Sequence, residues 1–298
     1  MKTLKPPKVS IVIAAHNEEK NIQNILNSIA LQVMNDFTLC EILVFLDGCT
    51  DTTKEKILNL ELILPIEIID DKKRLGKAQR VAQSIKISKG QIIVFLDADV
   101  VFIGKRSLQN LVFSFRNSRV GLVSGNDLPK IPKNHIQKVS SYFFETWGQI
   151  RKSKQDSIHN IHGAFYAIKT RSFLKIKIPK NLISDDQFFY IFAKKNNIGF
   201  VFCEDATVSY ELPSSLFGYL RQSARFIYFN KNMFRQLDGI NEEYRSLPKS
   251  QYFTILFKRF LRNPIYLTEA IILQIIVRLF IYQLTRDINR GKWQQNNK

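Results

Sequence analysis

The feature that most constrains the fold is a series of five short apolar runs within the first 128 residues, each separated from the next by an amphipathic stretch. The runs occupy residues 9–16, 41–47, 65–70, 91–100 and 120–125. Between them, apolar residues recur at steps of three and four, as in helices that pack one face against a sheet. Because the runs are almost continuously apolar, we expect strands that are buried on both faces. The pattern predicts an α/β fold with a mostly parallel sheet flanked by helices.

Polar side chains follow four of these runs, at the points where the predicted strands end. They are His16-Asn17-Glu18, Asp47, Asp70-Asp71, and the pair Asp97 and Asp99. Ligands of parallel sheets bind at the carboxyl ends of the strands, so we expect these groups to line one binding edge. Unpaired carboxylates are costly to bury, and Asp97 and Asp99 therefore require a metal ion, a basic residue or solvent. The predicted helix from residue 74 to 90 opens with Gly76-Lys77, which favours an anionic ligand at its N-terminus.

The charge of the chain is high and unevenly distributed. The net charge is +18; residues 129–180 carry 11 basic and 2 acidic side chains, and residues 251–298 carry 8 and 2. Such clustering favours an anionic membrane surface, a phosphorylated acceptor or a nucleic acid as partner. The alternative is that many of the lysines simply face solvent. Since no recognisable nucleic-acid-reading element is present, we do not expect nucleic acid as the partner.

The C-terminal region contains an apolar stretch, residues 264–284, interrupted by Glu269, Gln274 and Arg278. A spanning helix needs roughly 20 mainly apolar residues, and a central arginine costs about 2.5–3.5 kcal/mol. Basic residues lie on both sides of the stretch, as is typical of a helix in the interface of an anionic leaflet. We expect an interfacial helix; a single spanning helix and an ordinary core or subunit contact are the alternatives.

Seven motifs occur in an order that resembles the inverting family-2 glycosyltransferases of the GT-A fold. They are VSIVIAAHNEEKNI, FLDGCTDTT, GKAQRVAQSI, IVFLDADV, HGAFYAIK, SDDQ and QSARF, and they cover about residues 8–230. The resemblance implies a GT-A, Rossmann-like sheet with a C-terminal helical extension. It also implies a nucleotide-sugar-binding half (1–128) and an acceptor-binding and catalytic-base half (129–238). The basic and apolar composition of residues 239–298 predicts a membrane-associating helical segment after them.

The resemblance also implies roles for the acidic residues of the first half. Asp99 would bind Mg²⁺ or Mn²⁺ directly, and Asp97 would contact the ribose or the metal shell. As residues i and i+2 of one strand, both would point to the same side. Three further acids resemble the contacts to uridine and ribose, and one cation is placed to neutralise the diphosphate; these are Glu18, Asp47, Asp71 and Lys77.

The second half resembles the family in its base and in a helical signature. Asp186 aligns with the catalytic base and Asp185 with a supporting residue, the alternative for either being a helix cap. Gln222 and Arg225 lie three residues apart, on one helix face, where they would hold diphosphate and acceptor. Phe226 replaces the usual tryptophan of that signature, which weakens the expectation of processive polymerisation.

These observations predict a metal-dependent inverting glycosyltransferase. Its donor would be a nucleotide-diphosphate sugar, with UDP favoured, and its acceptor a cell-surface glycan or a polyprenyl-phosphate-linked molecule. The enzyme would be peripheral on the cytoplasmic face of the cell membrane. The alternatives are a processive polysaccharide synthase subunit and a non-catalytic scaffold that binds a nucleotide or a membrane.

Overall fold

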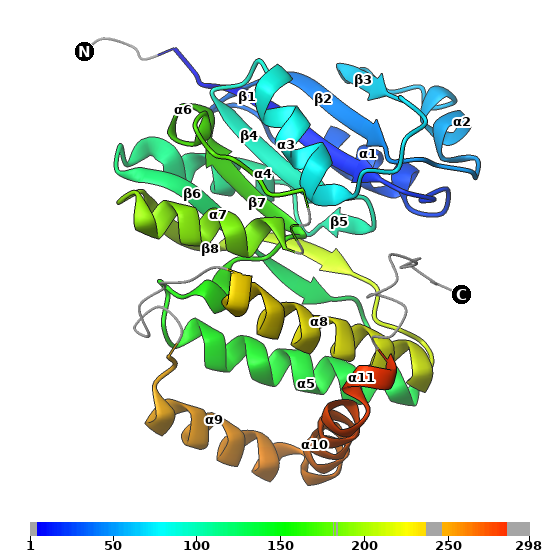
Figure 1. Ribbon diagram of the computed structural model, residues 1–298, viewed down its shortest axis with the longest axis vertical. Helices are drawn as coiled ribbons and strands as arrows, with labels where there is room; N and C mark the ends of the chain where they lie inside the picture. The colour runs from blue at the N-terminus through cyan, green and yellow to red at the C-terminus, as the bar shows by residue number, and fades with distance from the viewer. Residues whose placement is uncertain (1–4, 181, 183, 237–245, 285–298) are drawn as a thin grey trace. The chain divides into compact units, whose positions relative to one another are not determined.

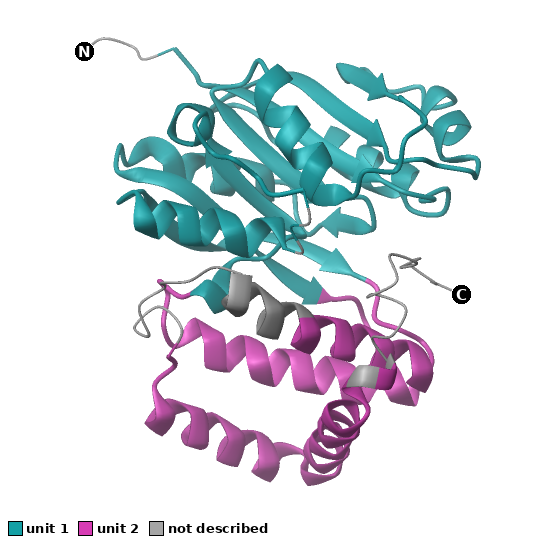
Figure 2. Ribbon diagram, viewed as in Figure 1, with its two compact units in different colours: residues 1–128, 158–210 teal, residues 129–157, 211–298 magenta. Residues whose placement is uncertain are grey.

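The computed structural model describes residues 5–180, 182, 184–236 and 246–284. The chain folds into two compact units (Figures 1 and 2). The first unit comprises residues 1–128 and 158–210, and the second comprises residues 129–157 and 211–298. These units are defined by packing, so the division into donor, acceptor and membrane segments stays a prediction.

The first unit is built on an eight-stranded sheet with the order β3-β2-β1-β4-β7-β6-β8-β5. The strands are β1 (Lys8–Ala15), β2 (Thr38–Leu46), β3 (Ile66–Ile69), β4 (Ile92–Asp97), β5 (Val100–Phe102), β6 (Val120–Pro129), β7 (Phe165–Lys169) and β8 (Gly199–Tyr210). β1 pairs in parallel with β2 and β4, and β2 pairs in parallel with β3. β7 is antiparallel to both β4 and β6, so β6 runs in the same direction as β4. The predicted α/β fold is confirmed, with β7 inserted in the opposite direction.

The helices of this unit have apolar residues at steps of three and four, and these residues form the face that packs against the sheet. The helices of the first unit are α1 (Ile22–Ala30), α2 (Thr53–Leu58), α3 (Lys77–Ile87), α4 (Ser107–Phe113), α6 (Thr170–Phe173) and α7 (Asp185–Lys195). In α1, Ile22, Ile25, Leu26 and Ile29 are fully buried in the core cluster with the β-strands. Strands β1 and β4 are buried along almost their entire length, as their continuous apolar runs predict.

The predicted strand 91–100 is divided by a turn. β4 ends at Asp97 and β5 begins at Val100, which pairs with Tyr210 of β8 rather than continuing along β1. Asp99 therefore lies in the turn between two strands. The expectation that one strand carries both Asp97 and Asp99 is wrong, so the alternation of side chains along a strand does not place them on the same side. A shared site for the two carboxylates stays a prediction.

The second unit is helical, with α5 (His135–Lys152), α8 (Leu216–Gln236), α9 (Lys249–Arg262), α10 (Pro264–Leu279) and α11 (Ile281–Leu284). α10 packs against α5 and α8, and its inward residues Leu267, Ala270, Gln274 and Val277 are buried. No helix in the described part of the chain combines the length and apolarity needed to cross a membrane. Residues 239–245 and 285–298 of the predicted membrane-associating segment lie outside the described residues.

Candidate active site

The loops that follow β1 and β2 are fastened to each other. Asn17 has a positive φ of 56°, and its side-chain oxygen accepts a hydrogen bond from the Thr50 N–H at 2.8 Å. The next residue, Glu18, donates its N–H to the Thr53 hydroxyl at 2.8 Å. These contacts fix the backbone at Glu18 and direct its buried carboxyl group, which accepts a hydrogen bond from the Asn21 amide at 2.8 Å.

Glu18 lies close to the acidic pair at the end of β4. Burial, together with the negative charges of Asp99 and Asp97, raises the pKa of Glu18 to about 7, against the hydrogen bond from Asn21. A raised carboxyl pKa is the expected result of gathering like charges in a partly desolvated place. Glu18 therefore lies within electrostatic reach of Asp97 and Asp99, two other predicted donor-site residues.

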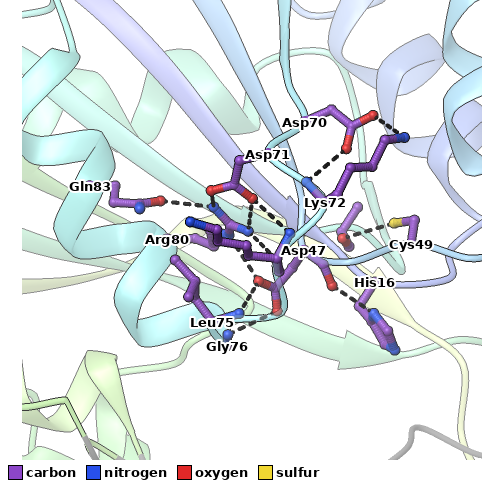
Figure 3. Close-up of polar contacts among 12 residues, drawn as sticks. His16, Asp47, Cys49, Asp70, Asp71, Lys72, Leu75, Gly76, Arg80 and Gln83 are labelled. Carbon is purple, nitrogen blue, oxygen red and sulfur yellow. Dashed lines mark hydrogen bonds and ion pairs between the residues drawn. The ribbon is translucent and has the colours of Figure 1, made fainter.

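Asp47, at the end of β2, organises the loop that leads into α3 (Figure 3). One carboxylate oxygen accepts the Leu75 N–H at 2.7 Å and the other accepts the Gly76 N–H at 2.9 Å. Gly76 has a φ of +86°, a conformation that glycine adopts without steric cost. Asp47 is buried, and its carboxylate therefore positions the start of α3.

A buried arginine on α3 joins two of the predicted nucleoside contacts (Figure 3). Arg80 is fully buried; its Nε donates to Asp47 at 2.8 Å, and its two terminal nitrogens donate to the two oxygens of Asp71 at 2.9 and 2.8 Å. The hydrogen bonds from Arg80 hold the pKa of Asp71 well below its usual range. Because both carboxylates are bound by this arginine, they hold the loop from residue 71 to 77 in its conformation. Their direct contact with a nucleoside stays a prediction.

Lys77, the first residue of α3, lies between the donor-side and the base-side carboxylates. Its Nζ donates to Asp97 Oδ1 at 2.5 Å and to the Gly163 carbonyl at 2.7 Å. Burial disfavours its charge, but the charges of Asp185, Asp97 and Asp186 outweigh this and raise the pKa of Lys77. The lysine is therefore a permanent cation at the point where these acids converge.

The two acids at the start of α7 have different surroundings. Asp185 is buried and accepts the Tyr166 hydroxyl at 2.5 Å, so its carboxylate is used inside the fold. Asp186 accepts the hydroxyl of Ser184, the N-cap residue of α7. Burial and the charge of Asp185 raise the pKa of Asp186 to about 6, in spite of Ser184 and Lys77. A carboxylate with such a pKa is suited to accept a proton near neutral pH.

Gly163 lies where Lys77 and Asp186 meet. A Cβ atom at this position would lie 3.3 Å from Lys77 Nζ and 3.4 Å from Asp186 Oδ2. The ammonium and the carboxylate therefore approach the same stretch of backbone closely, and a glycine leaves room for both. Lys77 is thus paired with Asp97, and Asp186 lies on the other side of the same glycine.

The donor set at Asp97 and Asp99 fits a divalent cation that arrives with a substrate. Within the described residues, no group of three or more His, Cys, Asp or Glu side chains is arranged to hold a metal ion by itself. Mg²⁺ characteristically binds through one or two carboxylates and the phosphates of its substrate, and keeps several waters. Asp97 and Asp99 supply two carboxylates of this kind, and together with the phosphates of a substrate they would hold such an ion. Their binding of a metal stays a prediction.

The sequence places this site in a known enzyme family. The sequence model described as "Glycosyl transferase family 2" matches residues 10–177, which contain the loops after β1, β2 and β4 as well as Lys77 and Gly163. This chain belongs to glycosyl transferase family 2. The matched residues include Glu18, Asp47, Asp71, Asp97 and Asp99 and end before Asp185 and Asp186.

Curated relatives of this glycosyltransferase differ in how much of their length it spans. An uncharacterised glycosyltransferase of Methanocaldococcus jannaschii is 25% identical over 70% of this chain and 72% of the relative. The poly-β-1,6-N-acetyl-D-glucosamine synthase of Staphylococcus epidermidis is 25% identical over 54% of this chain, which spans only 39% of the synthase. The chain therefore matches one relative along most of its length and a polymer synthase along a minor part.

Solved structures confirm the GT-A fold. A mannosyltransferase from Pyrobaculum calidifontis, in complex with GDP-Man and Mn²⁺, has a TM-score of 0.60 at 18% identity, covering 98% of this chain and 82% of the other. Glucosyl-3-phosphoglycerate synthase from Mycobacterium tuberculosis, in complex with Mg²⁺ and UDP, has a TM-score of 0.55 at 15% identity, covering 79% and 81%. At these identities the similarity concerns the fold of the glycosyltransferase.

Three residues of the site were not anticipated from the sequence: Arg80, Tyr166 and Ser184. The burial of Arg80 could have been suspected from the sequence, because Arg80 lies beside Val81 among the positions of α3 that are buried. Tyr166 lies inside an apolar strand and carried no signal for its partner. Ser184 is the first residue of the SDDQ motif, but its hydrogen bond to Asp186 was not predicted. Gln222 and Arg225 lie on α8 in the second unit, and their roles in substrate binding stay predictions.

Proposed function

We propose that this glycosyltransferase moves a sugar from a nucleoside-diphosphate donor to an acceptor hydroxyl with inversion at the anomeric carbon. The observation that carries the proposal is the neighbourhood of Gly163. Lys77, which donates to Asp97 at 2.5 Å, and Asp186, whose pKa is raised to about 6, both approach this glycine. An inverting transfer needs both functions in one site, because the base must act while the diphosphate leaves. UDP is the favoured carrier by resemblance, and GDP is the alternative.

Each side chain has a specific part in this proposal. Asp186 accepts the proton of the attacking hydroxyl, and Asp185, held by the Tyr166 hydroxyl, keeps the start of α7 in place. The Lys77 ammonium offsets negative charge between the two ends of the site. A divalent cation held by Asp97 and Asp99 would, when bound, neutralise the leaving diphosphate. Asp47 and Arg80 orient the loop from residue 71 to 77 toward the donor.

The acceptor is proposed to be a cell-surface glycan or a polyprenyl-phosphate-linked molecule at the cytoplasmic face of the membrane. The support is electrostatic, since residues 129–180 carry 11 basic and 2 acidic side chains. A basic surface concentrates polyanionic partners such as lipid phosphates. Polymerising activity is the second candidate, favoured by the similarity to a polysaccharide synthase over 54% of this chain.

Calorimetric titration tests the donor site. UDP, GDP and dTDP are titrated with and without Mn²⁺ into the wild type, Asp99→Asn and the matched control Asp205→Asn. Asp205 is an exposed acid of the first unit, so the control removes the same charge elsewhere. We expect Mn²⁺-dependent binding of one nucleotide, lost in Asp99→Asn and kept in Asp205→Asn. Binding that is unaffected by either Mn²⁺ or Asp99→Asn would contradict the proposed metal site.

Transfer assays test the reaction. With the matching sugar nucleotide, NMR of the product reports the anomeric configuration, and mass spectrometry separates a single addition from a ladder of lengths. Retention of configuration would contradict the role of Asp186. Donor binding without any transfer or hydrolysis would favour the scaffold interpretation instead.

A further inference from the structure

Helix α9 is held against α5 by a buried arginine. Arg259 is 4% exposed; its guanidinium lies 3.7 Å from the centre of the Tyr142 ring and donates to Thr146 Oγ1 at 3.0 Å and to Glu145 Oε2 at 3.2 Å. A stacked, multiply hydrogen-bonded guanidinium permits little rotation of the helix that carries it. One face of α9 is therefore fixed inward, and the opposite face is presented outward.

The outward face of α9 is apolar, although it faces solvent. Phe253, Phe257 and Leu261, spaced by four residues, are 69%, 64% and 67% exposed. Phe260 and Ile265 are exposed beside them. Side chains at these spacings form one stripe along a helix. A contiguous exposed patch of large apolar side chains is uncommon on a soluble surface and indicates an interaction site.

The charged residues of α9 itself are all basic. α9 carries four basic residues and no acidic one, and Lys249, Lys258 and Arg262 are exposed. The acid that follows, Glu269 on α10, is paired with His135 at 2.9 Å. Helix α9 therefore combines exposed aromatic rings with exposed cations, the combination found in helices that lie in the interface of anionic bilayers.

We infer that the outer face of α9 docks onto an anionic lipid bilayer, with Phe253, Phe257 and Leu261 entering the interface and Lys258 and Arg262 contacting headgroup phosphates. A second copy of this face would offer the cations no acidic side chain, whereas anionic headgroups supply one charge each. The inference rests on the proposed membrane-face function and moves the attachment from residues 264–284 to α9. The reason is charge. α9 carries four basic residues and no acidic one, whereas α10, whose Ile271, Ile275 and Leu279 are also exposed, carries Glu269 and Arg278.

Vesicle flotation with the full chain tests this inference. The wild type is compared with a triple variant, Phe253→Ser, Phe257→Ser and Leu261→Ser, on phosphatidylcholine vesicles with and without phosphatidylglycerol. The control triple variant is Leu58→Ser, Ile63→Ser and Leu174→Ser in the first unit, at positions that are 64%, 105% and 64% exposed. We expect binding to anionic vesicles, reduced about tenfold or more by the α9 changes and unchanged by the control.

A charge variant and a folding check complete the design. Lys258→Glu with Arg262→Glu should weaken binding to anionic vesicles about tenfold or more, as should added salt. The α9 variant should keep the thermal unfolding midpoint and nucleotide binding of the wild type. Retained donor binding separates this inference from the proposed reaction, which Asp186→Asn tests on its own.

Three results would overturn the inference. The first is that the wild type does not bind anionic vesicles, and the second is that the α9 variant binds them as strongly as the wild type does. The third is a wild-type dimer, detected by light scattering without lipid, that the α9 changes convert to a monomer. That last outcome would assign the face to a second copy of the chain.

Discussion

Replacing Arg80 with methionine should destabilise the first unit strongly. Methionine keeps the helix propensity of position 80 and part of its aliphatic volume, but it leaves the buried Asp47 carboxylate without its cation. Removing one partner of a buried ion pair costs about 3–5 kcal/mol. Asp47 keeps the Leu75 and Gly76 N–H groups, so we expect about 3 kcal/mol, the lower end of that range. Asp71 is 37% exposed and re-enters solvent, and it adds nothing to this figure.

Urea denaturation measures the effect. With a slope of about 3 kcal/mol per molar urea, a loss of about 3 kcal/mol lowers the midpoint by about 1 M. The matched control is Lys86→Met, which removes an exposed cation from the same helix and should leave the midpoint nearly unchanged. Hydrogen exchange of peptides covering residues 71–90 locates the change. A midpoint shift below about 0.3 M for Arg80→Met would refute the reasoning that Asp47 depends on this arginine.

Two further predictions concern the base and the glycine beside it. Because the pKa of Asp186 is raised to about 6, its carboxylate takes up a proton as the pH falls past 6, and kcat/KM should fall about tenfold per pH unit below that value. Initial rates from about pH 5 to about pH 8 measure this dependence, and a flat profile would contradict it. Asp186→Asn should lower kcat about 10²–10⁴-fold. Gly163→Ala places a Cβ 3.3 Å from Lys77 Nζ and 3.4 Å from Asp186 Oδ2, and should lower kcat/KM about tenfold; the control Gly148→Ala meets no atom within 4 Å and should keep full activity, so equal activities of both variants would argue against the Lys77–Asp186 approach.

Much of the first unit was predictable from the sequence because its signals are local. The apolar runs at 9–16, 41–47 and 65–70 correspond to β1, β2 and β3 within one or two residues at most ends, and β2 extends three residues earlier. The helix predicted between residues 74 and 90 contains α3, Lys77–Ile87. Local spacing suffices in these cases, because a strand buried on both faces or a helix with one apolar stripe shows its environment in consecutive residues.

The pairing of these elements was not readable in the same way. The sequence contains the runs of β4, β6 and β7 but not the insertion of β7 between the other two, which depends on contacts between residues far apart in the chain. Likewise, the apolar composition of residues 264–284 indicated an interface but not its face. The structure shows that α10 packs onto α5 and α8. It also shows that the neighbouring helix α9 exposes Phe253, Phe257 and Phe260.

By itself, then, the sequence determined the α/β class, the family and the identity of the acids at the strand ends. The tertiary structure decided what those acids contact: Arg80 reaches Asp47 across 33 positions, and Lys77 reaches the Gly163 carbonyl across 86. The physical reason is that a buried charge is stabilised by an opposite charge that lies close to it in the folded protein, and that partner can be far away in the sequence. Nothing in the residues next to Lys77 specifies which carboxylates the folded sheet will bring to it.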